Sequence, residues 1–387
     1  MNKNINIFKL IKGKNIALIS TQRYIDIKDN IIADAVLIND IINDLNLQGY
    51  NTKYFFQGDF YPNNILMNKY YKIKSDNSKK QKPRPVLSYI FFILTTLISD
   101  LSLKFKHEIY RRLKEFDTII VISPAMVGPI RHVFKKNKII ILYELNIEYK
   151  LLEFNLNKIN LNKISILSKI IIKIVKLWEI RAIALSDIIA CISPRDAKVL
   201  ATEFNKKIIV YYYPDIKIKK FESIKRPVQI TNILTNKQKI INDCDFIITF
   251  IGSCSIVNCY ALNEIIKINK KLNDEHIIFL MIGSIGNCWC VNNNIPDNII
   301  FCGIVKNLIN ILPVSNVFIL FDKQPTGIEG KIRTYKEYNK PVIGIGKEVK
   351  LNYFPFLGEL LLACNNDEDA VKKIESLKHN SVQKFCL

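Results

Sequence analysis

The sequence predicts an α/β fold in which two domains are each built around a doubly wound parallel β-sheet. Short apolar runs alternate with helical segments from residue 14 to residue 193, and the same alternation returns from residue 246 to residue 345. Strands that are apolar along their whole length are typical of parallel sheets covered by helices on both faces. A chain of 387 residues is also too long for one comfortable core, so two domains are expected.

The amino-terminal domain is predicted to occupy residues 1–213. Lys14–Ser20 (KNIALIS) is predicted to be its first strand, and Asp34–Leu47 follows as a helix because its apolar residues recur at helical spacing. Arg23, in the loop after the first strand, is either a contact for acceptor or phosphate or an ordinary surface arginine. Further strands are expected near Tyr54–Phe56 and at Asp117–Ser123 and Lys138–Leu142.

The carboxy-terminal domain is predicted to occupy residues 246–355. Phe246–Ser253 (FIITFIGS) and Ile277–Ser284 (IIFLMIGS) are two strands that each end in Gly-Ser, and Pro296–Val305 (PDNIIFCGIV) is a third strand that closes on a glycine. Phe318–Gly346 then gives a strand, a turn, a helix and a last strand at Val342–Ile345.

Two flanking segments complete the predicted organisation. Residues 214–245 are polar, basic and irregular, so they are expected to be a linker with an insertion. Residues 356–387 are expected to hold closing helices, one of them around Ala370–Leu377, with a return to the amino-terminal domain as one option.

The turn at Gln324–Gly327 has the features of a phosphate site. A turn that precedes a helix offers backbone N–H groups and the positive end of the helix dipole. Gly327 and Gly330 allow close approach, and Lys331 adds a positive charge. The alternative is an ordinary buried β-α-β unit with a lysine on its surface.

The order of these motifs from residue 246 to residue 345 resembles the carboxy-terminal domain of the GT-B glycosyltransferases, most closely family 4. Ser186–Ser193, preceded by Trp178-Glu179, resembles a strand of the family's other domain, and Lys207–Asp215 resembles the strand and turn that lead into its interdomain linker. The resemblance implies two Rossmann-like doubly wound domains that face a central cleft. It also implies a hexosyltransferase that moves a sugar from a nucleotide-diphosphate sugar to an acceptor, with retention of configuration and with no metal ion or cofactor besides this donor substrate.

The resemblance also assigns residues to the site. Lys331 takes the position of the family's lysine, which stabilises the departing diphosphate. Asn146 and Glu148, in a loop that also holds Glu144, resemble the acceptor-side pattern and complete the catalytic set. The donor-binding residues are Gly252, Ser253, Gly327 and Ile328 at the diphosphate, Gly283 and Gly303 at the base and ribose, and Thr326 and Thr334 at the positions of the family's paired glutamates.

The sequence departs from the family at those paired positions. Glu329 and Glu337 have the glutamates' mutual spacing but stand three residues out of register, so the role is not transferred to them. The basic residue usual after Gly252-Ser253 is also missing. Two alternatives to the transferase therefore stay open: a noncatalytic GT-B partner of another transferase, and a nucleotide-sugar epimerase of the same fold.

The positive charge is concentrated in the first part of the chain. The net charge is +21, and residues 1–250 hold 41 Lys and Arg against 22 Asp and Glu. Such a field attracts phosphate groups, whether on an anionic bilayer or on a lipid-linked or polysaccharide acceptor. Nucleic acid is a weaker option because no aromatic-basic signature or finger spacing is found. The alternative is that the excess lysines form a solvated face. The sequence does not predict the oligomeric state.

Two segments are candidates for a membrane surface. Val86–Ser99 is strongly apolar, but a helix of 14 residues would span about 21 Å, short of the roughly 30 Å hydrocarbon core. It either lies in the interface between flanking basic residues or is a buried helix. In the segment 168–184, Lys169, Lys173 and Lys176 share one helical face, which favours an anionic surface or forms a solvated stripe.

The cysteines predict a reducing compartment. Nine cysteines occur without paired CxxC groups, and Cys288-Trp-Cys290 has no second cluster, so a zinc site and a disulfide framework are not expected. The amino terminus lacks the pattern of a secretory signal. The expectation is a cytoplasmic protein with reduced thiols, either dissolved or peripheral on the inner face of the cell membrane.

Overall fold

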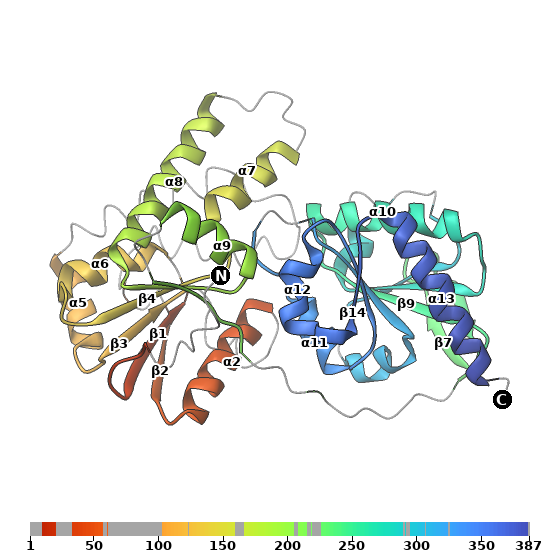
Figure 1. The fold of residues 1–387 in the computed structure, drawn as a ribbon, viewed down its shortest axis with the longest axis horizontal. Coiled ribbons are helices and arrows are strands. Elements are labelled where there is room, and N and C mark those ends of the chain that lie inside the picture. The colour runs from red at the N-terminus through yellow and green to blue at the C-terminus, as the bar shows by residue number, and fades with distance from the viewer. Residues whose placement is uncertain are drawn as a thin grey trace. The chain divides into compact units, whose positions relative to one another are not determined.

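The structure is a computed structural model, and it divides the chain into two compact units (Figure 1). The first unit comprises residues 1–215 and 325–328, and the second comprises residues 216–324 and 329–387. The residues that the structure describes are 10–20, 33–56, 60, 103–122, 124–158, 166–204, 208–214, 218, 226–288, 291, 295–305, 307–323 and 326–385.

The first unit contains a parallel sheet of six strands in the order β2-β1-β3-β4-β5-β6. The predicted strands are confirmed within a few residues at each end. The strands are β1 (Asn15–Ser20), β2 (Asn51–Phe56), β3 (Thr118–Val121), β4 (Ile139–Glu144), β5 (Ile188–Cys191) and β6 (Ile208–Tyr211).

Helices cover both faces of the first sheet. The predicted helix at residues 34–47 is α2. Two apolar cores result, one on each side of the sheet. The helices are α2 (Ala33–Leu47), α5 (Leu103–Leu113), α6 (Pro124–Phe134), α7 (Glu148–Lys158), α8 (Ile166–Leu185) and α9 (Pro194–Glu203).

The second unit contains a parallel sheet of six strands in the order β11-β10-β9-β12-β13-β14. Numbered from its own first strand, this is the order 3-2-1-4-5-6 of a Rossmann fold. The strands are β9 (Phe246–Ile251), β10 (Ile277–Ile282), β11 (Ile299–Gly303), β12 (Val317–Phe321), β13 (Val342–Ile345) and β14 (Leu361–Cys364). The apolar runs of β9, β10 and β12 are buried because helices cover both faces of the sheet.

The closing helix packs on the second unit. Ala370 and Ile374 of α13 (Asp367–Phe385) lie in the core of the second sheet. The helix also runs beside α10 (Ile256–Leu272), as Figure 1 shows. The remaining helices are α11 (Lys331–Glu337) and α12 (Val349–Leu357), with 3-10 turns at Ser284–Asn287, Leu308–Asn310, Leu312–Val314 and Gly358–Leu360.

The segment expected to be an irregular linker contains an antiparallel hairpin. Its strands are β7 (Val228–Thr231) and β8 (Gln238–Ile241). Ile230 and Ile241 are buried, and the Ile233 N–H donates to the Phe301 carbonyl at 2.9 Å, so the hairpin is docked on β11. The sequence did not predict these two strands because most of the hairpin's residues are polar and exposed, as in a loop.

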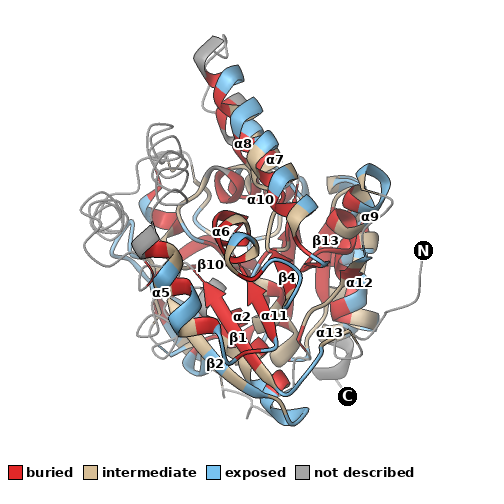
Figure 2. Cartoon of the chain, turned by 90° about the vertical axis from the view of Figure 1, so that its left-hand side faces the viewer, coloured by how far each residue is buried: buried red, intermediate tan, exposed pale blue. Residues whose placement is uncertain are grey.

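Burial follows the sheets in both units (Figure 2). The strands of the first sheet, apart from its edges at β2 and β6, are buried along most of their lengths. Among the described residues, no helix combines the length and apolar character needed to cross a bilayer. Arg23 and the apolar segment Val86–Ser99 lie outside the described residues.

Candidate functional site

The second sheet has its topological switch point between β9 and β12. In an open α/β sheet, a crevice forms there at the carboxyl ends of the strands, and ligands bind in it. The segment after β9 carries Gly252 and Ser253, and the segment that leads from β12 into α11 carries Glu329 and Lys331. The predicted donor-binding residues Gly252 and Ser253 and the predicted catalytic residue Lys331 therefore belong to the same end of one sheet.

Lys331 is the buried centre of this group. Its Nζ lies 2.5 Å from Glu329 Oε2, 3.4 Å from Asn258 Oδ1 and 3.8 Å from the centroid of the Phe250 ring. The side chains of Lys331 and Glu329 are only 7% and 5% exposed. Burial lowers the pKa of the Lys331 ammonium, and the Glu329 carboxylate opposes that shift. The pair is thus a charged couple held out of water against an aromatic face.

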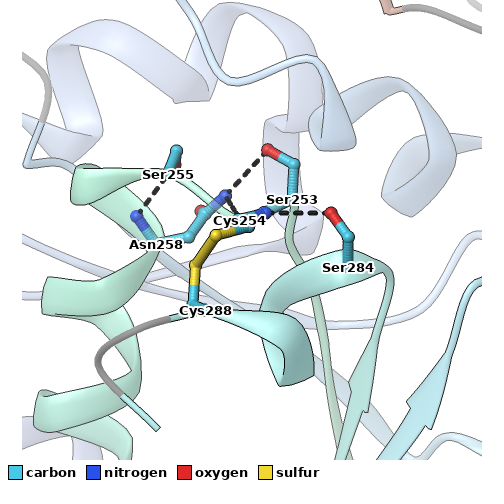
Figure 3. The surroundings of a disulfide bond; sticks show 6 residues. All are labelled: Ser253, Cys254, Ser255, Asn258, Ser284 and Cys288. Atoms are coloured by element: carbon cyan, nitrogen blue, oxygen red, sulfur yellow. Dashed lines mark hydrogen bonds between the residues drawn. A yellow bond between two sulfur atoms is a disulfide. The ribbon is translucent and has the colours of Figure 1, made fainter. Parts of the chain in front are cut away.

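Asn258 connects Lys331 to the loop after β9. Its Nδ2 donates to the Ser253 carbonyl at 2.8 Å, and its backbone N–H donates to Ser255 Oγ at 3.2 Å (Figure 3). Ser255 is the N-cap of α10, so this hydrogen bond fixes the start of the helix. The loop between β9 and α10 and the Lys331 ammonium therefore share one hydrogen-bonded partner.

A disulfide between Cys254 and Cys288 joins the same loop to the segment after β10 (Figure 3). The Cys254 N–H also donates to Ser284 Oγ at 3.0 Å. The expectation of reduced thiols does not hold for this pair. The two cysteines are 34 residues apart, and only the pairing of β9 with β10 brings them together.

The glycines at the strand ends have a packing role. Gly252 N–H donates to the Ile282 carbonyl, and Gly283 N–H donates to the Gly303 carbonyl, both at 2.8 Å. Gly283 has a φ of 107°, and a Cβ there would lie 2.3 Å from the Gly252 carbonyl oxygen. A Cβ on Gly303 would meet the Ile233 side chain at 3.2 Å. The close approach of the backbone at the ends of β9, β10 and β11 therefore explains the glycines of the Gly-Ser pattern, independently of nucleotide binding.

The first unit holds a second group, made of four acidic residues at the end of β4, at the start of α7, and on α8 and α9. Glu179 accepts hydrogen bonds from the backbone N–H groups of Glu148 and Tyr149, at 2.9 and 3.2 Å. Burial, reinforced by Glu148, raises the pKa of Glu179 to about 8. Burial, reinforced by Glu179, also raises the pKa of Glu144 well above its ordinary value. The fourth member is Asp196, whose pKa burial also raises.

The turn at Thr326–Ile328 belongs to the first unit and is bound to Asp196. Asp196 Oδ2 accepts the Gly327 N–H at 2.6 Å and the Thr326 hydroxyl at 2.8 Å. Thr326 Oγ1 in turn accepts the Ile147 N–H at 2.6 Å. The sequence predicted that the Gly327 amide would be offered to a diphosphate, whereas in this structure a carboxylate occupies it.

The remaining residues that the sequence singled out lie at the Thr326–Ile328 turn or on α11. A Cβ on Gly327 would lie 2.1 Å from Asn146 Oδ1, so Asn146 lines this turn. Ile328 packs on a core of the first unit. Thr334 is half-buried on α11, with its carbonyl accepting the Tyr338 N–H. Glu337 pairs with Arg333 on the same helix at 3.1 Å.

Sequence reasoning missed three residues that organise these groups. Asn258 carried no signal beyond its place near the start of a helix. Glu179 was noted only as part of Trp178-Glu179. Asp196 follows Ser193 by three residues, the spacing of a helix-capping pair, and Ser193 Oγ does accept the Asp196 N–H. That local signal predicts a helix start but not the bond to residues 130 positions away.

Comparisons with known proteins identify the fold. No protein family model matches the sequence. A search of curated proteins likewise finds no match. Among solved structures, a sucrose-phosphate synthase from Thermosynechococcus elongatus is similar to the chain with a TM-score of 0.58 and 12% identity, over 96% of this chain and 91% of that one.

Two further structures are similar at lower scores. TarM matches with a TM-score of 0.48 and 14% identity over 72% of this chain and 52% of that one, so the chain spans about half of TarM's length. Anabaena HepE in complex with UDP matches with a TM-score of 0.48 and 10% identity, over 95% and 91%. The TM-scores of TarM and HepE lie below 0.5, so these two similarities carry no argument. The similarity to the sucrose-phosphate synthase, at 12% identity, bears on the fold alone. The fold is the two-domain Rossmann-like α/β fold of the GT-B class.

Proposed function

We propose that the chain is a glycosyltransferase that takes a sugar from a nucleotide-diphosphate sugar. The observation that carries the proposal is the buried Lys331 ammonium at the switch point of the second sheet, next to Asn258 and the Ser253 loop. As the glycosidic bond breaks, negative charge develops on the departing diphosphate. A fixed cation in a water-poor site stabilises that charge, and Lys331 supplies it without a metal ion.

The contacts of Lys331 leave it able to serve a ligand. An ammonium has three N–H donors, and the described contacts place Glu329 and Asn258 near two of them. Glu329 keeps the lysine charged in the absence of donor, because an isolated buried ammonium loses its proton readily. In the proposed reaction the diphosphate shares the lysine with Glu329, and the Ser253 loop lines the same edge.

The donor-binding set of the proposal remains Gly252, Ser253, Gly283, Gly303, Thr326, Gly327, Ile328 and Thr334. Because Asp196 holds the Gly327 amide, contact between this amide and a phosphate requires that hydrogen bond to exchange. Asn146 and Glu148 are proposed on the acceptor side, at the carboxyl end of β4 and the start of α7. Family resemblance supports transfer with retention of configuration by a family 4-like enzyme.

Nucleotide binding is the direct test of this proposal. UDP and GDP are expected to raise the melting temperature of the full chain, since a ligand at 100 times its Kd stabilises a folded protein by about 2.7 kcal/mol. The assay is a thermal shift with UMP and inorganic pyrophosphate as controls, followed by incubation with the matching nucleotide sugar. A chain that binds no nucleotide at millimolar concentration contradicts the proposal and supports a noncatalytic partner. Epimerised sugar released without an acceptor contradicts transfer and supports an epimerase.

The acceptor is proposed to be a lipid-linked or polysaccharide precursor at a membrane surface. The support is the outer face of α8, defined as Lys169, Ile170, Lys173, Ile174 and Leu177. Ile170, Ile174 and Leu177 are 49%, 43% and 58% exposed and recur at helical spacing, and Lys169 and Lys173 are exposed beside them in the sequence. Exposed positions recur along α8 in Figure 2. An apolar stripe edged by lysine is suited to the interface of an anionic bilayer.

Liposome flotation tests the role of this face. The full chain is expected to float with anionic vesicles at low salt and not with neutral ones. The double variant Lys169→Gln, Lys173→Gln is expected to partition about 30-fold more weakly, because each lysine near such a surface contributes about 1 kcal/mol. The matched control is Lys372→Gln, Lys373→Gln, which removes two exposed lysines from α13. Equal flotation of both double variants would show that α8 is not the contact.

A further inference from the structure

We propose that Cys244, Asp245 and His276 form a binding site for a transition-metal ion, Zn²⁺ by its donor set, in the second unit. Cys244 Sγ lies 3.8 Å from His276 Nδ1, and His276 Nδ1 lies 3.2 Å from Asp245 Oδ1. The three ligand atoms all lie within 4.8 Å of one another. Asp245 immediately precedes β9 and His276 immediately precedes β10, so the site lies at the amino ends of these strands, away from Ser253 and Lys331.

The two separations that involve His276 Nδ1 are close to those of ligands that share one ion. Zn²⁺ binds thiolate at about 2.3 Å and imidazole or carboxylate at about 2.0 to 2.1 Å in a tetrahedron, which places two ligand atoms about 3.3 to 3.6 Å apart. The observed 3.2 and 3.8 Å bracket that range. Ligand atoms this close can close around an ion through small side-chain rotations, without movement of the strands.

The backbone around the site is held by hydrogen bonds that leave the ligand atoms directed at one another. Asp245 is buried, and its Oδ2 accepts the Asn242 N–H at 2.8 Å, which leaves Oδ1 for the ion. The Asp245 carbonyl accepts from Arg226 Nη1 at 2.7 Å. His276 is fixed through its carbonyl, which accepts the Phe246 N–H at 2.8 Å, and through its own N–H, which donates to Asp274 Oδ1 at 2.9 Å. Supporting hydrogen bonds of this kind orient the ligands of natural metal sites.

The chemistry of the three ligand groups determines which metal ion they favour. One thiolate, one imidazole and one carboxylate favour Zn²⁺ or Co²⁺ over Mg²⁺ and Ca²⁺, which take oxygen ligands. Cys244 and His276 are exposed, the latter to 53%, so an ion can reach them from solvent. Three protein ligands leave a fourth position for water. Without an ion, Asp245 contacts His276 and Cys244 is a neighbouring free thiol. The test therefore has to distinguish the ion-bound site from this ion-free arrangement.

A zinc site was not expected from the sequence, because the cysteines form no paired CxxC groups. Here Cys244 and His276 are 32 residues apart, and it is the pairing of Phe246 with Ile277 on adjacent parallel strands that brings them together. The site is therefore visible only once the register of the second sheet is known.

Cobalt titration of the full chain tests the proposal. The protein is stripped with EDTA, freed of chelator and titrated with Co²⁺ under anaerobic conditions without added thiol. A thiolate-to-cobalt charge-transfer band that saturates at about one equivalent and is displaced by Zn²⁺ is expected. Cys244→Ser is expected to abolish the band. His276→Ala is expected to raise the Kd for Co²⁺ at least about 100-fold, the upper range for loss of a group that only supports a ligand.

Matched controls make the result specific. Cys302→Ser removes another thiol of the second unit, and His132→Ala removes an exposed histidine of α6; both are expected to keep the band. Zn²⁺ is also expected to raise the melting temperature of the wild type and of Cys302→Ser but not of Cys244→Ser. Absence of the band in the folded wild type, or an equal band in Cys244→Ser, would overturn the proposal.

Discussion

Replacement of Lys331 by methionine is expected to lower the rate of sugar transfer about 10²- to 10³-fold. Loss of one group that stabilises the developing charge of a transition state costs about 2.7 to 4 kcal/mol. Lys331 is the cation held at the switch point beside Asn258, so the loss is expected in kcat, with a smaller change in KM for the nucleotide sugar. The measurement is steady-state kinetics with the donor identified by the thermal shift screen.

The folding consequence of this substitution has to be separated from its catalytic one. Removal of the lysine leaves the buried Glu329 carboxylate without its 2.5 Å partner, which destabilises a protein by about 3 to 5 kcal/mol. The double variant Glu329→Gln, Lys331→Met removes both charges and is expected to recover most of that stability. It is not expected to recover transfer. A double variant that transfers sugar at the wild-type rate would show that Lys331 has only a structural role.

A surface lysine provides the baseline for both variants. Lys347 lies in the same unit and is exposed. Lys347→Met is expected to change neither the transfer rate nor the melting temperature.

The central strands were predictable because each is an apolar run buried on both faces. Phe246–Ser253 and Val342–Ile345 were located from sequence to within two residues, since Gly, Ser and Pro mark where the runs end. The edge of the second sheet was not predictable in this way. β14, at one edge of the sheet, is only four residues long and has one exposed and one half-buried residue, so its sequence does not differ from that of a short loop.

The candidate site was predictable only where it is local. Lys331 and the Gly-Ser pair stand in recognisable order along the chain, and the structure brings Lys331 near Ser253 through Asn258. Glu179 and Asp196 were missed because their partners are distant in sequence, about 30 and 130 residues away. A hydrogen bond between residues that far apart is set by the packing of whole helices, which no short pattern encodes.

The threonine at position 326 also has a physical explanation that sequence alone did not give. Its hydroxyl donates to Asp196 and accepts from the Ile147 amide, so it needs to be both donor and acceptor. A glutamate at that position would place a further carboxylate against Asp196, in a region where burial and the neighbouring carboxylates already raise the pKa values of Glu144 and Glu179. The carboxylates around position 326 therefore explain why a threonine suits this site better than the glutamate of the family that the sequence resembles.

The buried Glu179 side chain of the first unit is expected to make the free energy of unfolding fall as pH rises. Glu179 has a pKa of about 8 in the folded state against an ordinary value of 4.5, so between these pH values the folded chain holds a proton that the unfolded chain has lost. The free energy of unfolding then decreases with pH by about 1.4 kcal/mol per unit for this group. Its stabilising effect is complete below pH 4.5 and is lost by about pH 8.

Glu179→Gln isolates this contribution, because glutamine keeps the size of the side chain and does not titrate. Between pH 5 and pH 8 the difference in unfolding free energy between wild type and variant is expected to shift by roughly 3 to 4 kcal/mol in favour of the variant. Urea denaturation at several pH values measures it. Glu153→Gln, an exposed change on α7, is expected to leave the wild-type slope unaltered. Parallel slopes for wild type and Glu179→Gln would mean that Glu179 is ionised in the folded protein throughout this range, and that its bonds to the Glu148 and Tyr149 amides outweigh its burial among carboxylates.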